Sequence, residues 1–177
     1  METLSNYIEI TKNSNIDMGM SNGATSVFIT VIGLSGSRLA KTDDEKKLLV
    51  WILEKDQSKC GIGTVGFTIS EMPWVKGNFE EQQIFLLNVI KGAKEKLGWE
   101  TLAYTPNEEY IFLITDIFSD MIKKLKKEDI DEEAIEEWEE AFDDNEPMNN
   151  GYPLCKEHNI LLSCFGCHAC NDQHFSI

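Results

Sequence analysis

Apolar residues recur every three or four positions in four stretches of the chain, a spacing that places them on one face of an α-helix. The predicted helices cover residues 43–55, residues 79–97, Asn107 to about residue 127, and Asp129 or Asp131 to about Phe142. Their starts carry capping residues: Thr42 with Glu45 forms a capping box, and Asn78 precedes the second helix. Gly98 is predicted at the C′ position that ends the second helix.

Extended structure is predicted where β-branched residues cluster. Residues 24–34 favour a buried strand, residues 61–70 a turn and a strand, and residues 99–104 a short strand. Residues 1–23 have no clear period and are expected to form a short helix or an irregular lead-in. Helices intermixed with so few strands predict an α+β fold, in which a small sheet packs with about four helices.

Length and composition indicate a globular protein. The 177 residues, 42% of them apolar, suffice for one domain, or for one domain with a small appendage. The N-terminus has no basic start followed by an apolar stretch, and no run approaches the roughly 20 apolar residues that cross a bilayer. We therefore expect a soluble, cytoplasmic protein that does not bind membranes.

Negative charge is concentrated in one segment of the chain. The net charge is −15, and 12 of the 31 acidic residues lie between Glu128 and Glu146, where there is no Lys or Arg. The rest of the chain carries 19 acids against 16 bases. This charge opposes direct contact with nucleic acid phosphates or anionic lipids, and a basic protein is the complementary partner.

The acidic segment has two interpretations. Apolar residues repeat at helical spacing within it, so one face of the helix would pack on the body and the acids would cover a solvated face. Alternatively, the carboxylates, which repel one another without a neighbouring base, would contact a cationic surface. The candidate partner-binding residues are Glu132, Glu133, Glu136, Glu137, Glu140, Asp143 and Asp144.

Four of the five cysteines and all three histidines lie between Cys155 and the C-terminus. Cys155 and His158 form a C-x2-H pair, and Cys167 and Cys170 form a C-x2-C pair eight residues later. Zn²⁺ prefers four such thiolate and imidazole ligands in a tetrahedron, and two short pairs on tight turns supply them. The spacing therefore predicts one zinc ion, and a closed Cys3His set indicates a structural rather than a catalytic role.

Other assignments of the tail remain open. Cys164 competes with Cys167 because residues 164, 167 and 170 are spaced three apart, and His168 and His174 are reserve ligands. The cysteines could instead be redox-active or catalytic, or they could be inert. We expect an α+β body over residues 1–146, ending in the acidic helix, and a knuckle- or ribbon-like tail over residues 147–177 that needs its metal to fold.

Catalytic motifs are weak in this chain. Gly61, Gly63 and Gly66 match the G-x-G-x-x-G of dinucleotide sites, but the predicted context is a helix before and a strand after, the reverse of what such a site needs. These glycines are expected to serve a turn or bulge. Walker, G-x-S-x-G and H-E-x-x-H motifs are absent, and no histidine precedes the tail. We therefore expect a protein that is not an enzyme.

The tail sequence PLCKEHNILLSCFGCHAC, the small size and the acidity resemble immunity proteins of bacterial polymorphic, or contact-dependent, toxin systems. That resemblance implies a tight complex with a cognate toxin domain, often a basic nuclease, whose active site the immunity protein blocks. Two alternatives come from other classes: a zinc-containing regulatory or nucleic-acid-associated module, and a metal-dependent hydrolase. Lys156 is the only base from residue 151 onward, which disfavours phosphate binding by the tail.

Overall fold

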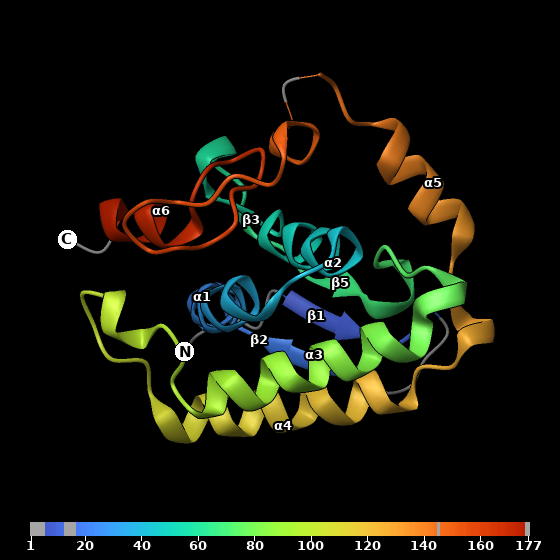
Figure 1. Ribbon diagram of the computed structural model, residues 1–177. Helices are drawn as coiled ribbons and strands as arrows, with labels where there is room; N and C mark the ends of the chain where they lie inside the picture. Colours follow the sequence, from blue (N-terminus) through green and yellow to red (C-terminus); the bar gives the residue numbers. More distant parts are fainter. Residues whose placement is uncertain (1–5, 13–16, 145, 176–177) are drawn as a thin grey trace.

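The computed structural model describes residues 6–12, 17–144 and 146–175 (Figure 1). The described helices are α1 (Asn22–Leu39), α2 (Asp43–Leu53), α3 (Phe79–Lys94), α4 (Glu108–Lys124), α5 (Glu132–Glu140) and α6 (His168–Phe175). The described strands are β1 (Asn6–Glu9), β2 (Asp17–Met20), β3 (Asp56–Gln57), β4 (Gly63–Thr64) and β5 (Phe67–Thr68). The α+β class is confirmed, and none of the described helices is long and apolar enough to cross a bilayer.

Helix α1 occupies the centre of the molecule and corrects the predicted strand over residues 24–34. Its residues from Phe28 to Gly36 are all buried, so they are apolar or small on every side and show no helical period. Contacts with α2, α3 and α6 surround it. Burial on all faces outweighs the β propensity of its Val, Ile and Thr residues, and Ser21 caps its start through a hydrogen bond from Ala24 N to Ser21 Oγ of 3.2 Å.

The sheets are small and lie beside α1. Strand β1 pairs antiparallel with β2 and parallel with β5, while β3 and β4 form a separate antiparallel pair. The expectation of a helix or irregular lead-in over residues 1–23 is therefore wrong for the described part, and residues 1–5 and 13–16 lie outside it. Ile8 and Met20 point into the core, because strand pairing lets two otherwise aperiodic segments bury alternate residues.

The other predicted helices are confirmed, with corrections at their ends. Helix α3 ends at Lys94, and Lys96, with a φ of 64°, takes the C′ position predicted for Gly98. The Asn78 side chain does not cap α3 but donates a hydrogen bond to Asp44 Oδ2 at 2.8 Å. Residues 99–101 form a 3-10 turn rather than the predicted strand, because Trp99 turns inward and is buried.

Gly66 is required by a close approach between strands. A Cβ atom on this residue would lie 2.2 Å from the backbone oxygen of Tyr7 and 2.6 Å from its nitrogen. We expect Gly66→Ala to lower the free energy of unfolding by about 2 kcal/mol, because backbone atoms of β1 must move. Gly77→Ala is the matched control, since nothing lies within 4 Å of its Cβ position. Urea denaturation of both variants measures the difference; equal midpoints would contradict the packing argument.

Candidate metal centre

Four side chains of the C-terminal segment converge on one point. The ligand atoms of Cys155, His158, Cys167 and Cys170 all lie within 4.8 Å of one another. His158 Nδ1 is 3.7 Å from Cys155 Sγ, 3.7 Å from Cys167 Sγ and 3.3 Å from Cys170 Sγ, and the sulfurs of Cys155 and Cys170 are 3.7 Å apart. The structure thus brings together the four residues that their spacing predicts, and they can hold a metal ion.

The first pair lies on a tight turn between two short extended segments. Cys155 N donates to Ile160 O at 2.8 Å, and Asn159 N donates to Cys155 O at 2.8 Å. Asn159 adopts a left-handed φ of 57°, a conformation that asparagine tolerates better than most residues. Leu154 and Leu161 form an antiparallel bridge behind the turn. This hairpin places Cys155 and His158 on one turn and directs the chain back toward the second pair.

The second pair lies at the start of α6. Gly166, with a φ of 85°, closes a turn in which its N–H donates to Ser163 O at 3.0 Å. Cys167 directly precedes the helix, and Cys170 occupies its first turn, so the two sulfurs share one side. The Cys170 N–H points at Cys167 Sγ, 3.5 Å away. Backbone amides directed at sulfur stabilise a thiolate, as expected of a metal knuckle.

Charge within the cluster also favours a cation. Burial would raise the pKa of the Cys155 thiol, but hydrogen bonds from the His158 backbone and side chain lower that pKa to about 6. Burial raises the pKa of Cys170 to about 12, together with its contact to Cys155 and the charge of Cys167. The protein alone therefore stabilises one thiolate and not three, whereas a bound divalent cation neutralises all of them.

Helix α1 holds this segment against the body. Arg38 Nη2 donates to His158 O at 3.1 Å, and Leu161 N donates to Ser37 Oγ at 2.9 Å. Ile160 and Leu161 are buried and belong to the same apolar core as the body. Figure 1 shows the tail lying over α1, far along the sequence but adjacent in space. The metal ligands are thus supported by a long, buried helix.

The reserve ligands have other places. Cys164 is exposed and belongs to a second group of side chains, with Glu54 and Glu146. His168 is buried and forms an ion pair with Asp56. The His174 side chain lies outside the described part of the chain. Cys167, rather than Cys164, therefore pairs with Cys170, because the turn at Gly166 directs the Cys164 side chain away from the cluster.

No protein-family model, curated protein or solved structure matches this chain.

His168, in the tail, contacts Asp56 and Ser26 of the body, which lie more than 100 residues earlier in the sequence. Its Nδ1 lies 2.5 Å from Asp56 Oδ2, while its Nε2 lies 2.9 Å from the backbone oxygen of Ser26 and 3.5 Å from Ser26 Oγ. Burial of Asp56 would raise its pKa, but the hydrogen bond and charge of His168 and the hydrogen bonds from Ser58 lower it below its usual value. The composition of this group is that of a Ser-His-Asp triad.

The geometry supports a clamp rather than a catalytic triad. A catalytic histidine needs a lone pair on Nε2 to accept the serine proton. Here Nε2 is closer to a carbonyl oxygen, which only accepts hydrogen bonds, and Nδ1 faces a carboxylate. Nε2 therefore donates to this carbonyl and has no lone pair free for a serine proton. The ion pair lies in the interior, where it links α6 to β3 and α1.

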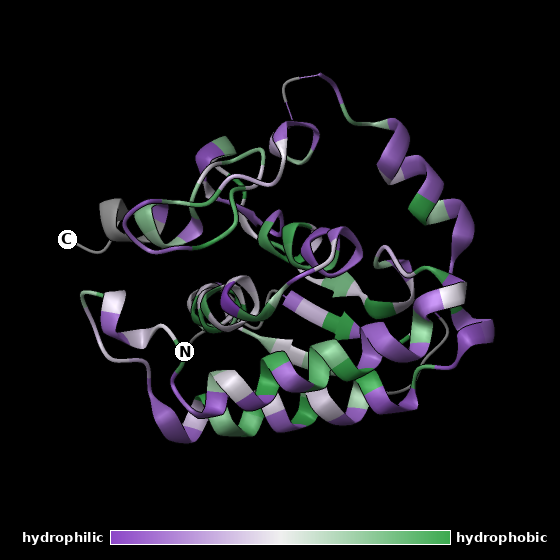
Figure 2. Ribbon diagram, in the orientation of Figure 1, coloured by the Kyte–Doolittle hydropathy of each residue, from purple (hydrophilic) through white to green (hydrophobic). Residues whose placement is uncertain are grey.

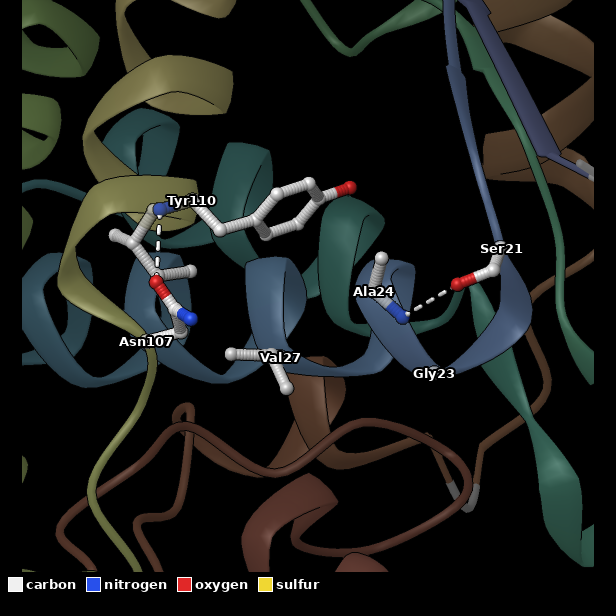
Figure 3. Close-up of a pocket in the computed structure, with 7 residues that line it drawn as sticks. Ser21, Gly23, Ala24, Val27, Asn107 and Tyr110 are labelled. Carbon is white, nitrogen blue, oxygen red and sulfur yellow. Dashed lines mark hydrogen bonds between the residues drawn. The ribbon is translucent and has the colours of Figure 1, made fainter. Parts of the chain in front are cut away.

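A separate cavity of about 480 Å³ lies between the starts of α1 and α4 (Figure 3). Ser21 and Asn107, the caps of the two helices, form part of its wall, and Asn107 Oδ1 accepts from Tyr110 N at 3.0 Å. Ala24, Val27 and Ile111 supply most of the remaining lining. No carboxylate, imidazole or thiol among the described residues lines this cavity, so it presents no acid-base pair.

The acidic helix α5 lies at the edge of the molecule, and its hydropathy is markedly polar (Figure 2). Ile135 is buried, Trp138 and Phe142 are half-buried, and Trp138 Nε1 donates to Glu54 Oε2 at 2.9 Å. Asp131 caps the helix by accepting from Ala134 N at 3.1 Å. The apolar face therefore packs on the body, as the periodicity predicts.

All seven candidate partner-binding residues are exposed: Glu132, Glu133, Glu136, Glu137, Glu140, Asp143 and Asp144. Two lysines from the body reach this helix, since Lys76 pairs with Glu132 at 2.8 Å and Lys47 with Glu139 at 3.4 Å. Within the described chain, Glu133, Glu136, Glu137, Glu140 and Asp144 form no ion pair. Trp51, Trp74 and Trp99 are buried, so of the four tryptophans only Trp138 borders this surface.

Proposed function

We propose that Cys155, His158, Cys167 and Cys170 bind one structural Zn²⁺ ion. The observation that carries this is the set of distances between ligand atoms. A zinc tetrahedron has edges of about 3.8 Å between two sulfurs and about 3.5 Å between sulfur and nitrogen. The chain has a sulfur–sulfur distance of 3.7 Å and sulfur–nitrogen distances of 3.3 to 3.7 Å.

The donor set favours a structural role for that ion. Three thiolates and one imidazole complete a tetrahedron, so no position is left for a water or a substrate. His158 is fully buried and Cys167 nearly so, which also keeps substrates away. The ion would hold the Cys155 hairpin and the start of α6 together on α1.

We further propose that the protein is a non-catalytic binding protein that blocks a basic partner, in the manner of an immunity protein against a bacterial toxin domain. The supporting observation is the exposed surface of α5 and the turn after it, where five carboxylates form no ion pair within the described chain. These carboxylates repel one another, and contact with a cationic surface would relieve that repulsion. Such a surface would steer a basic partner into an occluding complex.

Charge reversal on α5 tests this proposal. The variant Glu136→Lys, Glu137→Lys and Glu140→Lys is expected to slow association with the partner about 10-fold to 100-fold at low ionic strength, because steering depends on the summed field. Reading frames adjacent to the gene supply the first candidate toxin domains. Stopped-flow mixing of the two purified proteins at low and high salt measures the rate.

A control with the same change in net charge lies on another face. Glu95, Glu109 and Asp120, on and after α3 and on α4, are exposed and form no ion pair within the described chain. Their reversal to Lys should change the association rate by less than about threefold. Equal slowing in both variants would show that net charge alone matters, and unchanged rates in both would remove α5 from the interface.

A further inference from the structure

A second group of metal-binding side chains lies outside the Cys3His cluster. Glu54 ends α2, Glu146 precedes the 3-10 turn Pro147–Asn150, and Cys164 lies in the loop before Gly166. One ligand atom from each lies within 4.8 Å of the other two. Three segments that are distant in the sequence thus direct two carboxylates and a thiol at one point.

One oxygen in this group lacks any partner that the described residues could supply. Glu146 Oε2 is buried and accepts no hydrogen bond there. A buried carboxylate oxygen without a donor or cation costs free energy, and such atoms are rare in folded proteins. An ion bound between the three side chains would satisfy this oxygen.

The two carboxylates form no ion pair within the described chain, although the charge of the neighbouring Lys55 lowers the pKa of Glu54. The neighbouring Lys55 has its Nζ over the Trp51 ring, 3.8 Å from the ring centroid. Glu54 Oε2 accepts a hydrogen bond from a neutral donor, Trp138 Nε1, at 2.9 Å. A neutral N–H donor orients the carboxylate of a metal ligand but does not neutralise its negative charge.

Burial raises the pKa of each of the three groups, which favours their neutral forms when no cation is bound. Burial raises the pKa of Glu54, the Trp138 hydrogen bond and the Lys55 charge partly oppose that rise, and the charge of Glu146 adds to it. Burial and the charge of Asp143 raise the pKa of Glu146. Partial burial of the Cys164 thiol raises its pKa to about 12, with added contributions from the charges of Glu54 and Glu146. A divalent cation would reverse each of these shifts, because it stabilises the deprotonated forms.

We propose that Glu54, Glu146 and Cys164 form a second site for a divalent transition-metal ion, with three protein ligands and one coordination position open to solvent. The thiolate selects a zinc-like ion over Mg²⁺ or Ca²⁺, which prefer oxygen ligands alone. Because Cys164 is exposed, the fourth position faces water and remains available to a ligand from outside the chain.

This second ion would connect the tail to two parts of the molecule that the first ion does not reach. It would join the end of α2 to the segment that follows the acidic helix and to the tail. Trp138, on α5, contacts one of its ligands directly. With two oxygen ligands and solvent access, the site would bind more weakly than the Cys3His site and exchange its ion more readily. Occupancy would therefore respond to the metal concentration while the Cys3His site stays filled.

Adding Co²⁺ to the full-length protein already loaded with one Zn²⁺ tests the proposal. We expect a further equivalent to bind, with the sulfur-to-metal charge-transfer absorption of a single thiolate. Cys164→Ser should abolish this absorption. Losing a residue that only hydrogen-bonds to a metal ligand weakens metal binding roughly 10-fold to 100-fold. Glu146→Gln removes a ligand itself and should weaken binding of the second ion by more than that. Zinc content, measured by inductively coupled plasma analysis, should stay at one per chain in both variants, which separates this site from the Cys3His site.

Two controls make the result decisive. Cys60→Ser removes another exposed thiol, and Glu140→Gln removes an exposed carboxylate of α5; both should bind the second ion as the wild type does. Circular dichroism checks that each variant is folded. The proposal is overturned if no second equivalent binds, if binding persists without Cys164, or if Cys60→Ser abolishes it.

Discussion

Cys167→Ser is expected to release the zinc ion and to lower the free energy of unfolding by more than about 4 kcal/mol, an effect of the size reserved for lost metal sites and disrupted cores. Metal binding by a site that exists only in the folded chain contributes directly to folding. Cys167 is buried, and its sulfur lies 3.7 Å from His158 Nδ1, so a hydroxyl there leaves a weaker ligand in an enclosed position. The hairpin at Cys155 and the start of α6 would then lose their common anchor.

Metal analysis and urea denaturation measure the two parts of this prediction. Wild-type protein purified without added metal should contain one zinc per chain, and a strong chelator should lower its stability as the substitution does. Cys60→Ser is the matched control, because Cys60 is exposed and lies outside the cluster. A metal content far below one per chain, or a Cys167→Ser variant as stable as the control, would contradict a structural zinc site.

His168→Ala is expected to lower the free energy of unfolding by about 3–5 kcal/mol, the usual cost of leaving one member of a buried ion pair unpaired. Asp56 is 4% exposed, and without His168 its carboxylate keeps, among the described residues, only the hydrogen bonds from Ser58. The same change frees α6 from the backbone oxygen of Ser26. The loss should therefore combine an uncompensated charge with a detached tail helix.

The companion variants distinguish a clamp from a catalytic triad. Ser26→Ala should cost less than about 1 kcal/mol, since the closer contact of His168 is to the backbone oxygen that alanine retains. The double variant Asp56→Ala with His168→Ala should cost less than the sum of its single changes, by roughly 0.5–3 kcal/mol. Zinc content should stay at one per chain throughout. Labelling of Ser26 by a fluorophosphonate would contradict the clamp, because only an activated serine reacts.

Local signals in the sequence were sufficient for several elements. Caps and apolar periodicity predict α4 and α5 closely, because each has one buried face, while the capping box at Thr42 marks the start of α2. The metal ligands can also be recognised from short spacings, because a C-x2-H pair and a C-x2-C pair converge when the chain between them folds back. Helix α1 was missed for the opposite reason. It is buried on all sides, so it has no period to reveal it.

The sequence by itself determined the α+β class, the amphipathic helices and a tail rich in metal ligands, with Cys164 still competing with Cys167, since each depends on residues close together along the chain. Only the tertiary structure decided how distant residues meet. It places His168 against Asp56, although the sequence has no histidine before the tail and had suggested a body without imidazole chemistry. It also places Cys164 beside Glu54 and Glu146 rather than with the Cys3His ligands. These contacts form because distant segments pack around α1. A pattern of neighbouring residues cannot show which distant segments will meet there.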